Sequence, residues 1–134
     1  MPATHRQLAY AAHARPGVTA PAISALIERR RAASAEQRLT GVMVYTGEDF
    51  VEWAEGPAPA IERFAATLSA EPVFGRARIL VDRTAPTRWF RGWRAGYVPS
   101  RSFDPWLVGL ESGSLDEAAR LDAMKRFLEE ARTF

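Results

Sequence analysis

The sequence predicts a single α+β domain, and three observations lead to this prediction. The chain has 134 residues, the usual size of one domain, and a chain of this length buries roughly two-thirds of its unfolded surface. A hydrophobic content of 47% and a charged content of 25% indicate neither a disordered chain nor a membrane protein. Short β-branched and aromatic runs alternate with segments of helical periodicity, which predicts strands and helices around one core.

A turn signal separates the first predicted strand from the first helix. Residues 7–12 are apolar and short, and Arg15-Pro16-Gly17 predicts that this strand ends in a turn. Thr19 is a suitable helix N-cap, and Pro21 suits a first helical turn. One face of the predicted helix then repeats at helical spacing, with Ile23, Leu26, Ile27, Arg30 and Ser34.

The next two strands form a predicted hairpin. Residues 39–45 are β-branched and aromatic, and a turn at 46–49 connects them to a strand at 50–54. Because strand side chains alternate between the two faces, Glu52 lies on an otherwise apolar face. The other side chains of this strand on that face are Phe50 and Ala54.

A second helix and two strands complete the predicted five-stranded mixed sheet. The helix over 58–70 has one apolar stripe, and residues 78–81 and 89–98 are predicted as the fourth and fifth strands. The order β-α-β-β-α-β-β is that of a ferredoxin-like fold, in which both helices cover one face of the sheet. The helical stripe consists of Ile61, Phe64, Ala65 and Leu68.

The C-terminal segment, residues 101–134, is predicted as a helical extension of a domain formed by residues 1–100. Ser114-Leu115-Asp116-Glu117 resembles a capping box, which predicts a helix over 115–132. We expect its apolar stripe to pack on the second face of the sheet, and a homodimer contact is the alternative. That second face carries Val51 and Trp53.

Composition narrows the classes of function. The chain has no cysteine, which excludes disulfides, thiolate catalysis and Cys-based metal sites. Its two histidines, His5 and His13, are not at ligand spacing, so we expect no metal site. The net charge is +2, and the arginines at 29–31 fan out around a helix, so we expect no nucleic-acid binding. No signal peptide and no membrane span are predicted, which favours the cytoplasm.

Two polar side chains in the predicted sheet are candidates for a functional site. The first and third strands are neighbours in this topology, so Tyr10 and Glu52 are expected to meet beneath the helices. A carboxylate in that position costs free energy unless it is paired or protonated. The alternatives are a core tyrosine with a satisfied hydroxyl and an enzyme that uses Glu52 as general base. The enzyme ranks last, because no second acid, histidine or metal set converges there.

The chain resembles the BLUF family of flavin-based blue-light sensing domains over about residues 6–100. The order and spacing of the matching residues fit without gaps from Tyr10 to Gly56. The matching segments are Leu8-Ala9-Tyr10, Leu39-Thr40-Gly41, Phe50 followed by Trp53-Ala54-Glu55-Gly56, and Arg88-Trp89-Phe90 followed by Trp93.

This resemblance implies a flavin, FAD or FMN, held between the two helices. It places Tyr10 at the family's photochemical tyrosine and Trp93 at its tryptophan, with Leu26 and Leu68 as ring contacts. Glu52 stands where the family has a glutamine. An ionised carboxylate only accepts hydrogen bonds, whereas an amide both donates and accepts. Among the family's polar anchors, an asparagine position is held by Ser34.

The sequence is compatible with two functions. The first is a BLUF-like flavin-binding sensor with an impaired or altered light switch, which signals to a downstream protein partner. The alternative is a flavin-free interaction module with the same fold. In a flavin-free form, Arg30 on the inner stripe of the first helix is expected to approach Glu52; the alternative is that Arg30 extends along the helix to solvent.

Overall fold

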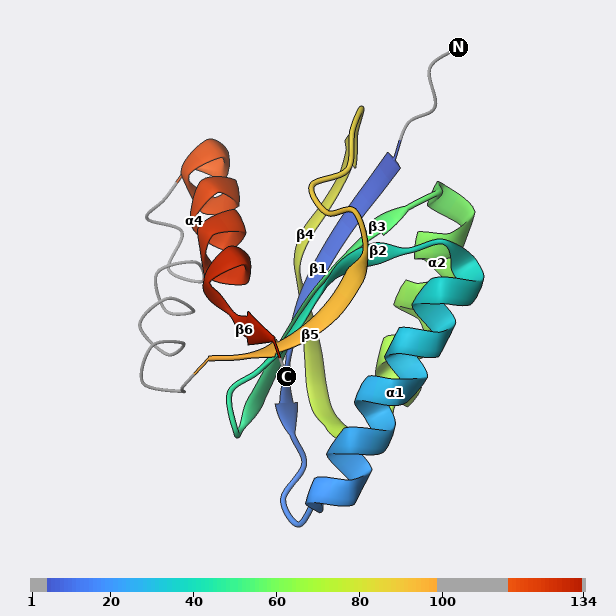
Figure 1. Cartoon of the computed structure of the whole chain (residues 1–134), viewed down its shortest axis with the longest axis vertical. Coiled ribbons are helices and arrows are strands. Elements are labelled where there is room, and N and C mark those ends of the chain that lie inside the picture. Colours follow the sequence, from blue (N-terminus) through green and yellow to red (C-terminus); the bar gives the residue numbers. More distant parts are fainter. Residues whose placement is uncertain (1–4, 99–115, 134) are drawn as a thin grey trace.

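The structure, a computed structural model, describes residues 5–98 and 116–133. Its centre is a mixed sheet of six strands in the order β4-β1-β3-β2-β5-β6. The pairing of β2 with β5 is parallel and the other pairings are antiparallel. Helices α1 and α2 cover one face of the sheet, and α4 lies on the other (Figure 1). The elements are β1 His5–Ala14, α1 Ala20–Gln37, β2 Thr40–Tyr45, β3 Asp49–Gly56, α2 Ala58–Thr67, η1 Leu68–Ala70, β4 Phe74–Ala85, β5 Trp93–Tyr97, α4 Glu117–Glu130 and β6 Arg132–Thr133.

Each face of the sheet has its own hydrophobic core. The alternation of β3 divides its side chains as predicted, because Phe50 and Ala54 belong to the core under α1 and α2, whereas Val51 and Trp53 belong to the core under α4. The first core also contains Tyr10, Leu26, Ile61, Phe64 and Leu68. The second also contains Val42, Val44, Met124, Phe127 and Leu128. Helix α4 therefore packs on the second face of the sheet.

The predicted bounds of the fourth and fifth strands are wrong and a sixth strand was not predicted, because pairing partners rather than local pattern decide them. The fourth strand extends over Phe74–Ala85 instead of 78–81, since it pairs along most of β1. The fifth strand begins only at Trp93, because the preceding residues form a loop that is held by the Glu55 carboxylate. The sheet has a sixth strand, Arg132–Thr133, which pairs with β5.

The two long helices differ in how well their starts were predicted. Thr19 caps α1 as expected, and its hydroxyl accepts a hydrogen bond from the Ala22 amide at 3.3 Å. Helix α4 instead begins after Asp116, whose carboxylate accepts from the Ala119 amide at 2.7 Å. Asp116 replaces the expected cap at Ser114, which lies outside the described residues. No helix in the described ranges is both long and apolar enough to cross a membrane.

One close approach in the sheet requires glycine. Gly41 has φ +152°, and a Cβ built on it lies 1.7 Å from the Trp53 carbonyl oxygen. Only a residue without Cβ lets β2 come this close to β3. The resulting register places Met43 directly opposite Glu52 on β3, and Tyr10 of β1 lies on the other side of the same residue.

Candidate functional site

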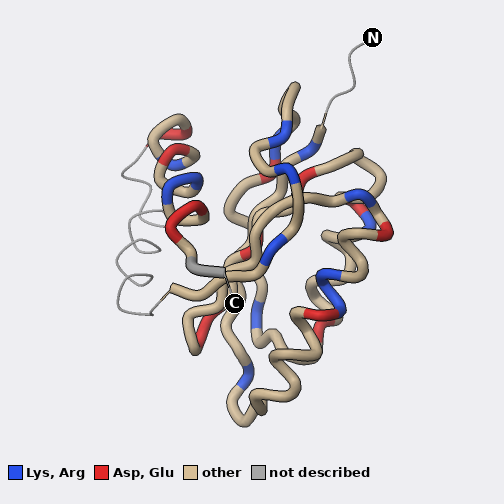
Figure 2. Tube along the Cα trace, in the orientation of Figure 1, with Lys and Arg blue, Asp and Glu red and all other residues tan. Residues whose placement is uncertain are grey.

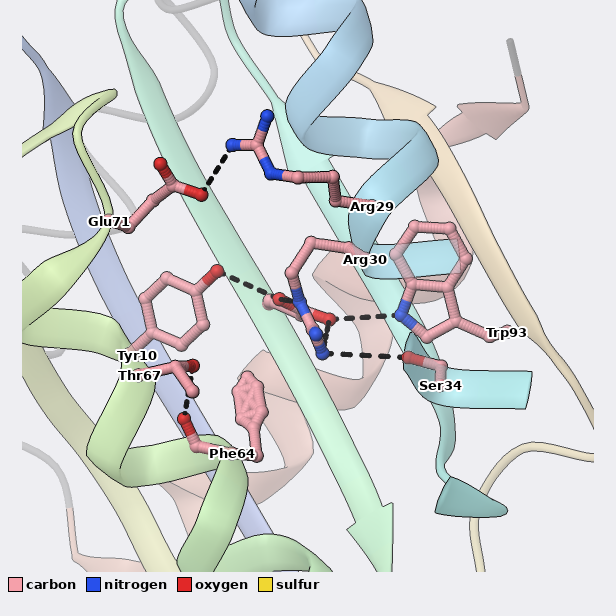
Figure 3. Close-up of polar contacts among 9 residues, drawn as sticks. Tyr10, Arg29, Arg30, Ser34, Phe64, Thr67, Glu71 and Trp93 are labelled. Atoms are coloured by element: carbon pink, nitrogen blue, oxygen red, sulfur yellow. Dashed lines mark hydrogen bonds and ion pairs between the residues drawn. The ribbon is translucent and has the colours of Figure 1, made fainter. Parts of the chain in front are cut away.

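The candidate site is centred on Glu52, a strand carboxylate with no solvent exposure. Its oxygens accept hydrogen bonds from three side chains that come from three different elements. The Tyr10 hydroxyl of β1 donates at 2.8 Å and the Trp93 indole nitrogen of β5 at 2.9 Å. Arg30 of α1 donates twice, from Nε to Oε1 and from Nη2 to Oε2, each at 3.1 Å. Figure 3 shows these donors converging beneath the helix.

Arg30 neutralises the carboxylate by a bidentate ion pair. The Arg30 side chain is 13% exposed and that of Glu52 is 0% exposed. Burial works to lower the pKa of Arg30, but the charge and hydrogen bonds of Glu52 outweigh it, so the pKa lies above its ordinary value. A guanidinium binds a carboxylate best through two parallel hydrogen bonds in one plane. The expected approach of Arg30 to Glu52 is thus present in the structure.

Tyr10 is the neutral donor of this network. Burial raises the pKa of its hydroxyl well above the ordinary value, and the charge of Glu52 raises it further. A tyrosine with a raised pKa keeps its proton and can only satisfy the carboxylate as a donor. The ring packs against Phe64 and Phe74, with centroids 5.9 and 5.5 Å away.

The Arg30 side chain also contacts the second helix. Its guanidinium carbon lies 4.3 Å from the centre of the Phe64 ring on α2, and Nη2 is 3.5 Å from the Ser34 hydroxyl. The guanidinium therefore extends from α1 across to α2. Leu26 and Leu68, the two predicted ring contacts, are buried in the same core. Five of the seven predicted site residues form one hydrogen-bonded network: Tyr10, Arg30, Ser34, Glu52 and Trp93.

A second buried carboxylate, Glu55, was noted in the sequence only as part of a motif. It accepts from the Trp89 and Phe90 amides at 2.8 and 2.7 Å, and so holds the loop before β5 against the end of β3. Three side chains complete its shell: Gln7, Thr40 and Trp53. Its place two residues after Trp53 in a buried strand is the sequence signal that points to it.

Arg94 connects the site to the opposite face of the sheet. It follows Trp93 on β5, so the two side chains point to opposite faces. Its guanidinium donates to the carbonyl oxygens of Leu128 and Ala131 at the end of α4, each at 2.9 Å. Two consecutive residues of β5 therefore connect the two faces of the sheet. Trp93 contacts Glu52 and Arg94 contacts the end of α4.

The described residues contain no group of three or more His, Cys, Asp and Glu side chains that could hold a metal ion. Fold and site together define a small α+β domain in which two helices cover a buried, hydrogen-bonded polar network on the sheet. Residues 6–96 match the family described as BLUF, sensors of blue-light using FAD. The chain belongs to this family.

Solved BLUF proteins share the fold. The dark-state structure of BlrB has a TM-score of 0.71 and 21% identity, with 94% of this chain and 96% of that chain covered. The photo-activated state of BlsA has a TM-score of 0.76 and 15% identity, with 97% and 98% covered. For BlrP1 of Klebsiella pneumoniae with manganese and cy-diGMP, the TM-score is 0.66 and the identity 21%, and 94% of this chain matches 33% of that longer chain. No curated protein matches this chain.

In this arrangement the guanidinium of Arg30 occupies the space between α1 and α2. Arg30 lies against Phe64 there, and the network around Glu52 is satisfied by its own members. The buried side-chain polar atoms without a partner in the described ranges belong to His5, Gln37 and Arg120, none of which is in the network. No unsatisfied polar atom of the network is thus available to a ring.

Proposed function

We propose that this chain is a BLUF-fold signalling module that acts through protein contacts, with the Arg30–Glu52 pair in place of a flavin between its helices. The observation that supports the proposal is the two-bond contact between Arg30 and Glu52. A module of this kind is not itself an enzyme. Its partner is a downstream protein, and we expect it to act in the cytoplasm.

The energetics of the pair favour this function. Insertion of a ring would have to move Arg30 off Glu52 and leave a fully buried carboxylate with two neutral donors. Breaking a buried ion pair by removing one partner costs about 3–5 kcal/mol. A flavin would have to supply that free energy in addition to its own desolvation and ordering.

The second candidate is a flavin-binding sensor, with FAD or FMN, whose light response is altered. It is favoured by the membership of the BLUF family and by the two neutral donors, Tyr10 and Trp93, that surround Glu52. In its ionised form Glu52 cannot donate a hydrogen bond. The response of this chain to light would therefore differ from that of a glutamine-containing domain.

For both candidates we propose that output passes through the sheet to α4 or to a second copy of the chain. Trp93 contacts Glu52 on one face, and Arg94 holds the end of α4 on the other. A partner or a homodimer that contacts α4 would then respond to the state of the network. The same route serves with or without a flavin.

An absorption spectrum of the purified chain distinguishes the two candidates. We expect a colourless protein that does not take up added FAD or FMN. A yellow protein with flavin bands would establish the second candidate instead. Illumination with blue light would then show whether a shift occurs, and Glu52→Gln is the variant expected to restore the family's behaviour.

A further inference from the structure

A basic hollow of about 710 Å³ lies between the C-terminal end of α1 and the loop before β5. Small-ligand sites have volumes of roughly 300–1,000 Å³. Its lining, all of it in the described part of the chain, includes four arginines and no acidic residue: Arg31, Arg38, Arg88 and Arg91. The whole chain is nearly balanced, with 18 basic and 16 acidic residues. The hollow therefore concentrates positive charge, whereas Figure 2 shows basic and acidic positions spread along the trace of the described residues.

Three of these arginines have no carboxylate partner among the described residues. Arg88 donates to three neutral oxygens, on the Arg38 carbonyl, the Thr40 hydroxyl and the Glu55 carbonyl, at 2.9, 3.1 and 3.4 Å. These bonds fix its position without neutralising its charge. The side chains of Arg38 and Arg91 make no hydrogen bond or ion pair with any residue that the structure describes. Arg31 pairs with Glu28 at 3.4 Å, in an exposed contact.

The backbone of Arg38 provides a second, independent observation. It ends α1 with φ +59° and ψ +36°, and it is the one non-glycine residue with positive φ in the described ranges. Glycine is the usual residue at this position of a helix end, because a Cβ is disfavoured there. Strained conformations of this kind concentrate at ligand sites. An arginine in place of glycine puts a guanidinium at the hollow at a conformational cost.

The buried carboxylate of Glu55 lies beneath the same loop. Its oxygens are occupied by Gln7, Thr40 and Trp53 and by the Trp89 and Phe90 amides. Those contacts hold the loop, and with it Arg88 and Arg91, opposite the end of α1. The hollow is thus built on a fixed segment.

We propose that this hollow binds a small phosphate-bearing anion. Guanidinium groups form two parallel hydrogen bonds with phosphate oxygens, and several unneutralised arginines around one hollow suit a multiply charged group. Phe90 and Trp93 in the lining offer apolar rings to a nucleobase. The phosphate groups that the arginines would bind are present both in a nucleotide and in inorganic pyrophosphate. The proposal goes beyond the proposed function and holds whether or not a flavin is bound.

The site is adjacent to the Glu52 network without coinciding with it. Ser34 and Trp93 line the hollow, and both donate or accept hydrogen bonds within the network. An anion in the hollow would thus contact Trp93, the first residue of β5, which is followed in the chain by Arg94 and its contact with α4. This gives the anion a route by which it alters the output of the module.

Isothermal titration calorimetry of the full chain in low-salt, phosphate-free buffer tests the proposal. ADP is expected to bind saturably at one site and adenosine not to bind. Tighter binding of ADP than of pyrophosphate identifies a nucleotide site, and equal binding identifies an inorganic-phosphate site; both outcomes support the proposal. Absence of saturable binding by either anion, or adenosine binding as tightly as ADP, would overturn it.

Three variants separate site binding from attraction to net charge. Arg38→Gly relieves the strained backbone, so its melting temperature should not fall, while the affinity for ADP or pyrophosphate should weaken about tenfold. Arg91→Ala should weaken it by about as much. Arg63→Ala removes an exposed arginine of α2 outside the hollow and should leave the affinity unchanged. Equal weakening by Arg63→Ala would show binding to overall charge and refute the site.

Discussion

Replacement of Arg30 by serine removes the cation from the centre of the site and leaves Glu52 with its two neutral donors, Tyr10 and Trp93. The carboxylate is 0% exposed, so it depends on these neighbouring side chains for its hydrogen bonds. Loss of one member of a buried pair costs about 3–5 kcal/mol. The two donors that remain place the expected loss of unfolding free energy near 3 kcal/mol. That is a large share of the roughly 5–15 kcal/mol of a typical domain.

Urea denaturation followed by tryptophan fluorescence measures this loss. With a slope of about 2 kcal/mol per molar urea, the midpoint should fall by about 1.5 M. The control is Arg63→Ser, an exposed position on α2, which should change the free energy of unfolding by less than about 0.5 kcal/mol.

A double variant tests whether the loss arises from the stranded charge. Glu52→Gln in the Arg30→Ser background replaces the carboxylate by a neutral amide, and the double variant should be more stable than Arg30→Ser alone. The expected coupling energy is about 2–3 kcal/mol. Arg30→Ser also removes the guanidinium that lies over the Phe64 ring, so Arg30→Ser should take up FAD or FMN better than the parent. A loss below about 1 kcal/mol in Arg30→Ser, together with additive free energies, would refute the ion pair as the element that closes the site.

Three further predictions concern the switch, the proton on Tyr10 and the C-terminal helix. If the chain binds flavin, the red shift on blue illumination should be absent or altered and should approach the family's in Glu52→Gln; a normal reversible shift in the parent would contradict this. The raised pKa of Tyr10 means that the folded state keeps a proton that the unfolded chain loses near pH 10. Stability should therefore fall as pH rises above about 10, and Tyr10→Phe should flatten this slope in urea titrations; an unchanged slope would show that other groups cause it. Arg94→Ala should destabilise the chain by about 1–3 kcal/mol and speed amide exchange in the last turn of α4, whereas Arg126→Ala, at an exposed pair with Asp122, should do neither; equal effects would contradict the role of Arg94.

Much of the candidate site followed from residue type and position. A carboxylate on the apolar face of a strand has to find partners, which marked Glu52. The neighbouring strands and the inner stripe of the first helix then supplied Tyr10 and Arg30. The role of Glu55 was not predicted, because five donors from four segments of the chain surround it only in the folded state.

Strand lengths show the limit of local pattern. More than half of β4 consists of charged or small residues that carry no strand signal, and these residues are extended because β1 supplies a pairing partner along them. The opposite holds for 89–92, which are aromatic enough to predict a strand but are drawn into a loop by the Glu55 carboxylate. Long-range hydrogen bonds outweighed propensity in both segments.

By itself the sequence determined the α+β class, the order of the elements, the two faces of β3 and the family, because each depends on residue periodicity and motif spacing within a continuous stretch of chain. Tertiary structure alone decided which partner satisfies each buried charge. Arg30 could extend along its helix to solvent or cross to Glu52, and the sequence is compatible with both. The fold selects the crossing, because Glu52 and Phe64 provide a carboxylate and an aromatic face where solvent is excluded.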